Sequence, residues 1–150
     1  MKIKGCWSIN QELPLISILI RITNPINQIN IIKSALLDTA FSGYCALDSN
    51  TISTLNLPKV GGGKAFTAMG EISYENYLGI IDILTPEQTP VKRIELLYQD
   101  RQSLSNLIEP TDQSIIIQNF NLNLLGIKAI YQSDWMVLSS KNLICMVDLT

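Results

Sequence analysis

An acidic loop near residue 40 carries the residues best suited to catalysis. The apolar segment Ala35-Leu36-Leu37 leads directly into Asp38-Thr39-Ala40-Phe41-Ser42-Gly43. Small and turn-forming residues after an apolar run predict a tight loop at the end of a strand, so Asp38 would stand at the border of the core. A carboxylate placed there can act as a general acid or a general base. It can also do no more than cap its own loop as an Asx turn.

The composition limits which other chemistry is available. The 150 residues contain no histidine, which excludes Ser-His and Cys-His nucleophile pairs and zinc sites with histidine ligands. The net charge of −2 offers no basic surface for a nucleic-acid backbone, so no nucleic-acid partner is expected. Gly61-Gly62-Gly63-Lys64 does not make a phosphate loop, because Pro58 and Ala65 stand where such a loop needs Gly and Ser or Thr. We expect no metal and no cofactor.

Two further features follow the acidic loop along the chain. A hairpin is expected around Gly70-Glu71, and Leu124-Leu125-Gly126 comes immediately before a short expected helix at Ile127–Gln132. This order resembles the stand-alone bacterial and archaeal retropepsin-like aspartic peptidases. In that family a hydrophobic-hydrophobic-Asp-Thr/Ser-Gly loop packs on a later hydrophobic-hydrophobic-Gly segment. The resemblance covers roughly Leu15 to Val147 and implies an all-β fold, a closed retropepsin-like β-barrel with one or two short helices.

The resemblance also assigns a role to each part of the site. It implies that Asp38 is the catalytic acid or base and that Thr39 donates its hydroxyl to the loop of a second chain. Ala40 stands where the family usually has glycine, which costs about 1–2 kcal/mol if the backbone φ is positive there and little if it is negative. Leu125 and Gly126 would support the loop, while the hairpin would close over the substrate as a flap. The residues expected to bind substrate from the flap and the cleft are Phe41, Met69, Gly70, Glu71 and Ile72.

The chain contains a single loop of this kind. Asp48, Asp134 and Asp148 lack a small-residue turn with glycine behind them. Amide hydrolysis needs a base that takes a proton from water and an acid that protonates the leaving amine. Two copies of Asp38 held close together would share one proton and supply both groups. Because members of the family are homodimers with one loop in each chain, we expect a homodimer.

These observations predict an aspartic endopeptidase that hydrolyses an extended peptide or protein substrate between two chains. A second hypothesis, favoured by Ala40, is a peptide-binding or dimerisation module of the same fold without hydrolysis. A third is a monomeric β-domain in which Asp38 is only structural.

The elements that position the loop follow from the apolar patterns. Leu15–Ile22 and Ile29–Leu37 predict a hairpin, and a short helix is expected over Asn50–Leu57 with Asp48 or Ser49 as its cap. The remaining expected features are strands at Tyr44–Leu47, Lys64–Met69, Ile72–Leu84, Val91–Tyr98, Ser114–Gln118, Trp135–Leu138 and Leu143–Val147, and a flexible joint at Gly61-Gly62-Gly63.

The length predicts one domain over residues 1–150, with the polar residues 100–113 as a surface insertion. Cys6, Cys45 and Cys145 are odd in number, far apart and without a CxxC pair, which indicates free thiols rather than a disulfide framework. The N-terminus has no signal-peptide pattern and no apolar run is long enough to span a bilayer. We therefore expect a cytoplasmic protein without a membrane partner.

Overall fold

The computed structural model describes residues 1–13, 15–67, 70–105 and 113–150 of the chain. Strands make up 52 % and helices 16 %, so the mostly-β class predicted from the sequence is confirmed. The strands are β1 (Lys2–Ser8), β2 (Ser17–Thr23), β3 (Asn30–Leu37), β4 (Cys45–Asp48), β5 (Lys59–Thr67), β6 (Gly70–Leu84), β7 (Pro90–Arg93), β8 (Ile115–Phe120), β9 (Leu124–Leu125), β10 (Asp134–Leu138) and β11 (Leu143–Asp148). Within the described ranges the α-helices number three rather than one or two: α1 (Ser49–Leu55), α2 (Tyr98–Ser105) and α3 (Ile127–Ile130).

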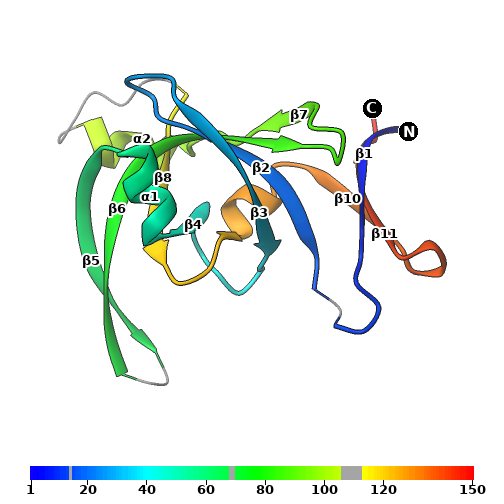
Figure 1. The fold of residues 1–150 in the computed structure, drawn as a ribbon, viewed down its shortest axis with the longest axis horizontal. Helices are drawn as coiled ribbons and strands as arrows, with labels where there is room; N and C mark the ends of the chain where they lie inside the picture. Colours follow the sequence, from blue (N-terminus) through cyan, green and yellow to red (C-terminus); the bar gives the residue numbers. More distant parts are fainter. Residues whose placement is uncertain (14, 68–69, 106–112) are drawn as a thin grey trace.

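The larger sheet follows the strand order β2-β3-β9-β4-β8-β6-β5, with β7 beside β6. β2 is also antiparallel to β6, from Leu19 opposite Leu84 to Thr23 opposite Ile80. Strand pairing therefore runs from β2 through β3, β9, β4, β8 and β6 and returns to β2. The far part of the β5–β6 hairpin extends away from this circuit, as Figure 1 shows.

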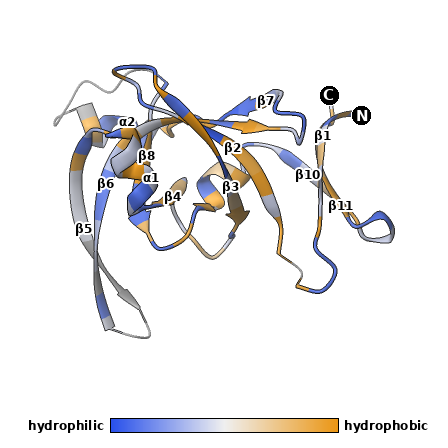
Figure 2. Cartoon of the chain, in the orientation of Figure 1, coloured by the Kyte–Doolittle hydropathy of each residue, from blue (hydrophilic) through white to orange (hydrophobic). Residues whose placement is uncertain are grey.

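Isoleucine side chains of β2 lie at the centre of the core. Ile18, Ile20 and Ile22 are at most 1 % exposed, and residues of intermediate burial alternate with them. The alternation follows from strand geometry, because successive side chains point to opposite faces. Figure 2 shows hydrophobic colouring along much of β2. Fully buried residues on the strands that complete this core include Leu47, Ile81, Ile83, Ile115, Ile117 and Leu125.

A smaller sheet brings the two ends of the chain together. β11 lies between β1 and β10 and is antiparallel to both, and the termini lie side by side in Figure 1. Trp7 of β1 fixes this sheet to the larger one. Its side chain is 3 % exposed, its indole N–H donates a hydrogen bond to the Leu84 carbonyl (2.9 Å), and its ring lies 5.8 Å from that of Trp135.

Two of the three cysteines form a disulfide, so the expectation of three free thiols is wrong. Cys6 and Cys145 face each other across β1 and β11, with their Cα atoms 4.1 Å apart. The sequence concealed this pair because 139 positions separate the two residues, and only the pairing of the terminal strands makes them neighbours. Cys45 is free and buried. The cysteines therefore no longer support the expected cytoplasmic location.

The local elements around the acidic loop are confirmed. The expected hairpin is β2–β3, paired from Ser17 opposite Leu36 to Thr23 opposite Asn30. α1 begins after Asp48, whose carboxylate accepts a hydrogen bond from the Thr51 N–H (2.7 Å). This bond holds the pKa of Asp48 below its usual range. Asp48 is therefore a helix cap, as predicted.

Other predictions need correction. Gly61-Gly62-Gly63 lies inside β5 and is not a joint between elements. The strand expected over Val91–Tyr98 ends at Arg93, and α2 begins at Tyr98. The segment expected as a surface insertion, 100–113, contributes to the core through Leu104, which is 7 % exposed; residues 106–112 of it lie outside the described ranges. No helix in the described part of the chain has the length and hydropathy to cross a bilayer.

Candidate active site

The loop that carries Asp38 begins where β3 meets β9. These two strands are parallel, with Leu36 opposite Leu124 and Leu37 opposite Leu125. The Asp38 N–H then donates a hydrogen bond to the Leu125 carbonyl (2.9 Å). The apolar segment before Asp38 thus pairs with Leu124 and Leu125 of β9. Asp38 is the first residue after β3, and it is partly exposed.

Gly126 seats this loop on the start of α3. Its N–H donates to the Tyr44 carbonyl (2.9 Å), and the Ile127 N–H donates to the Phe41 carbonyl (2.9 Å). A Cβ atom on Gly126 would lie 2.2 Å from the Gly43 carbonyl oxygen and 2.7 Å from that of Phe41. Backbone cannot give way as a side chain can, so the contact requires glycine. The structure brings Leu125 and Gly126 directly beneath the Asp38 loop.

Gly126→Ala is expected to lower the free energy of unfolding by about 1–3 kcal/mol, the usual range for an overpacked site. Urea denaturation measures this loss. The matched control is Gly79→Ala, whose Cβ would meet the terminal Cδ1 of Ile117 at 2.4 Å. That atom ends a side chain that can rotate, so the control should lose less. Equal losses in the two variants would contradict the importance of the backbone contact.

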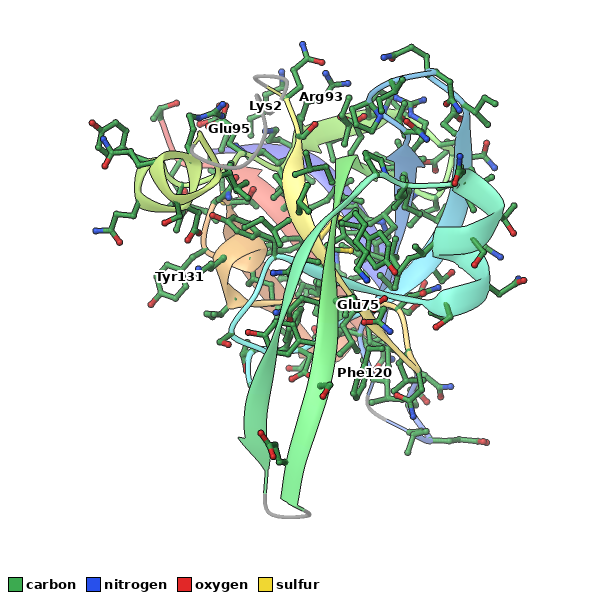
Figure 3. All side chains as sticks on the ribbon, turned by 90° about the vertical axis from the view of Figure 1, so that its left-hand side faces the viewer. Lys2, Glu75, Arg93, Glu95, Phe120 and Tyr131 are labelled. Carbon is green, nitrogen blue, oxygen red and sulfur yellow. A yellow bond between two sulfur atoms is a disulfide. The ribbon has the colours of Figure 1, made fainter. Side chains whose placement is uncertain are left out.

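Asp38 lines a groove with a volume of about 700 Å³. Three parts of the fold form most of its walls: the acidic loop, one strand of the projecting hairpin, and the end of β8 with the turn after it. One residue each of β4 and β9 also lines it. Figure 3 shows Glu75 and Phe120 near one another where the hairpin leaves the body of the molecule. The lining residues are Asp38, Ala40, Phe41, Ser42, Ala46, Ser73, Tyr74, Gln118, Asn119, Phe120, Asn121 and Leu124. Among the described lining residues, Asp38 is the one with a carboxyl group.

The Asp38 carboxylate is held by its own loop. Its Oδ1 accepts a hydrogen bond from the Ala40 N–H (3.0 Å), the geometry of an Asx turn. Among the described residues its Oδ2 has no hydrogen-bond partner. One oxygen therefore orients the group while the other is available to a molecule in the groove.

Ala40 fits its position without backbone strain. Among the described non-glycine residues, positive φ angles occur at Gln28, Asn56, Gln88 and Asn142, and Ala40 does not belong to this group. The cost of about 1–2 kcal/mol expected for a positive φ therefore does not arise. Ala40 is exposed and lines the groove, so its methyl group forms part of the surface that a ligand would meet.

The other residues expected in the site differ in whether they line the groove. Thr39 is exposed on the loop. Phe41 lines the groove, and its ring also covers Gly43 and Gly126, because a Cβ atom added to either glycine would lie 2.6 or 2.7 Å from that ring. Gly70 and Glu71 are exposed at the start of β6, farther along the hairpin than the lining residues Ser73 and Tyr74. Met69 lies outside the described residues, and Ile72 is a residue of β6 whose backbone pairs opposite Ala65.

Sequence reasoning missed the rest of the lining. Tyr74 lies opposite Gly63, where a Cβ atom would approach its hydroxyl oxygen to 2.7 Å, so the glycine in this strand makes room for the ring. Asn119 accepts a hydrogen bond from the Glu75 N–H (2.8 Å) and ties β8 to the hairpin. The polar run that contains it comes just before Leu124-Leu125-Gly126, and this closeness to the loop-supporting segment was the signal available in the sequence.

The remaining chemical groups do not enter the groove. Cys45 is fully buried, and burial strongly raises the pKa of its thiol. Within the described ranges, no group of three or more acidic or cysteine side chains could hold a metal ion.

No protein-family model matches the chain, and no curated protein matches it either.

Proposed function

We propose that the chain is an aspartic endopeptidase of retropepsin-like architecture, active as a homodimer that cleaves an extended peptide between its two Asp38 loops. One observation carries the proposal. A carboxylate at the end of β3, seated on Gly126, faces a groove bordered by one strand of the β5–β6 hairpin. The closed circuit of paired strands supports the barrel that this architecture requires.

Hydrolysis would proceed through a water molecule held between the two carboxylates. The ionised Asp38 takes a proton from this water as the water oxygen bonds to the peptide carbonyl carbon. The protonated Asp38 of the second chain donates its proton to the amide nitrogen, and the C–N bond breaks. The two groups thus exchange roles in one cycle, with no net gain or loss of protons. Oδ2 of Asp38, which accepts no hydrogen bond from a described residue, is the oxygen suited to this task.

The second candidate is a peptide-binding module of the same architecture without hydrolysis. Ala40 favours it, because its methyl group lines the groove beside the carboxylate and would keep a substrate carbonyl from approaching closely. The Asx turn of Asp38 also serves a purely structural role. This candidate shares the groove and the homodimer with the first, and differs only in turnover.

Digestion of a defined peptide mixture between pH 3 and pH 7 separates the two candidates. The endopeptidase should release new termini in amounts proportional to enzyme concentration, and the Asp38→Asn chain should release none of them. A module without activity would retain peptides and leave them intact. Sedimentation velocity at micromolar concentration should show a dimer; a purely monomeric species that fails to cleave would contradict both candidates and favour a monomeric domain in which Asp38 is structural.

A further inference from the structure

A buried tyrosine links the Asp38 loop to α2. Tyr44 follows the loop directly and is 2 % exposed. Its hydroxyl donates a hydrogen bond to Asp100 Oδ2 (2.5 Å) and accepts one from the Leu97 N–H (2.8 Å). Lys128 of α3 completes the cluster, because its Nζ lies 3.0 Å from the same Asp100 oxygen and 5.3 Å from the centre of the Tyr44 ring. Three separate segments therefore meet at one phenol.

The backbone groups of this cluster hold the loop itself. The Tyr44 carbonyl accepts the Gly126 N–H (2.9 Å), and the Lys128 N–H donates to the Gly43 carbonyl (3.2 Å). Tyr44, Asp100 and Lys128 are absent from the lining of the groove, so their side chains act behind the loop rather than on a ligand. A shift of the Tyr44 side chain would therefore also displace the backbone of residues 43 and 44, which holds the Asp38 loop on α3.

The hydrogen bonds of the cluster shift the pKa of two of its groups. Burial acts to raise the pKa of Asp100, but hydrogen bonds from Tyr44 and Lys128 outweigh it and leave that pKa below its usual range. Burial and the hydrogen bond to Asp100 strongly raise the pKa of Tyr44, so its hydroxyl keeps its proton. Both directions favour the contact seen in the structure, in which one carboxylate oxygen of Asp100 accepts hydrogen bonds from the Tyr44 hydroxyl and the Lys128 ammonium group.

We propose that Tyr44 and Asp100 are positioning residues, which use α2 as a brace to hold the Asp38 loop in its reactive geometry. The proposal rests on the endopeptidase function for its effect on turnover, and on the observed contacts alone for its effect on the loop. It gives the segment around α2 a purpose: residues 98–105 supply the carboxylate that fixes the far side of the catalytic loop.

Two variants test the brace. Tyr44→Phe removes one hydroxyl and keeps the ring; Asp100→Asn keeps the shape and removes the charge that Lys128 faces. Both are expected to lower kcat about tenfold and to change KM less than twofold, because a misplaced reacting group affects turnover more than binding. Amide hydrogen exchange at Gly126 and Lys128 should become about tenfold faster, while exchange at Ile20 of β2 stays as in the unmodified chain.

The matched control is Tyr131→Phe, which removes the same group from a residue that is 84 % exposed just after α3 and points outward in Figure 3. It should change neither kcat nor exchange. If Tyr44→Phe and Asp100→Asn behave like this control in both measurements, the brace is overturned and the endopeptidase function stands. If the unmodified chain cleaves no peptide, the endopeptidase function fails, and amide exchange at Gly126 and Lys128 becomes the test of the brace. Unchanged exchange rates in the Tyr44→Phe and Asp100→Asn variants would overturn the brace, and faster rates would support it.

Discussion

Asp38→Asn is expected to lower kcat/KM for peptide cleavage by about 10²- to 10⁴-fold, the usual contribution of a general acid or base. An amide can neither take the proton from water nor donate one to the leaving amine. Its Oδ1 can still accept the Ala40 N–H bond, which is 3.0 Å long in the structure. The loop should therefore keep its conformation, and urea denaturation should show a free energy of unfolding within about 0.5 kcal/mol of the unmodified chain. Steady-state rates on one peptide identified by digestion provide the activity measurement.

Asp134→Asn is the matched control for this change. Asp134 is an exposed residue of β10 outside the groove lining, so the same substitution there should leave kcat/KM within a factor of two. An Asp38→Asn chain that cleaves the same bonds at the original rate would rule out the proposed mechanism. Loss of both activity and stability in that variant would instead assign Asp38 a structural role.

Opening the disulfide between Cys6 and Cys145 is expected to lower the free energy of unfolding by about 2–4 kcal/mol. The bond closes a loop between residues 139 positions apart, and a long closed loop restricts the unfolded chain far more than the folded one. The double variant Cys6→Ser with Cys145→Ser should show this loss in urea denaturation. Its fold should otherwise be retained, because β1 still pairs with β11 along its length.

A reducing agent supplies the control for that experiment. It should destabilise the unmodified chain and a Cys45→Ala chain by equal amounts, since both contain the bond. It should have no effect on the double serine variant. A chain purified in air that presents three titratable thiols, with stability indifferent to reduction, would contradict the disulfide.

Features that depend on near neighbours in the sequence were predictable. The apolar residues before Asp38 and the cap at Asp48 each follow from local patterns, and the structure has a strand end and a helix start at these positions. The seat on Gly126 was expected only through a family resemblance. That family remains a proposal, because no family model and no curated protein matches the chain.

Features that depend on distant contacts were missed for a physical reason. Nothing near Cys6 indicates that it faces Cys145, because only the sheet formed by the two chain ends makes them neighbours. Gly63 was predicted to be part of a flexible joint because the residue that explains it, Tyr74, lies on the next strand. Only the pairing of the two strands shows that this glycine makes room for the tyrosine ring. The far wall of the groove likewise comes from the segment around Asn119, whose place beside the hairpin is set by a hydrogen bond to Glu75.

Both flanks of β11 are occupied by strands of its own chain, β1 on one side and β10 on the other. The C-terminal strand of a second molecule therefore cannot pair beside β11. The disulfide between Cys6 and Cys145 also keeps β11 attached to β1 of its own chain. In the homodimer proposed above, the C-terminal segment of each chain would therefore stay in its own sheet rather than exchange between the two chains. Mixed pairs of differently labelled molecules should then form by simple dissociation and rebinding, at a rate unrelated to unfolding.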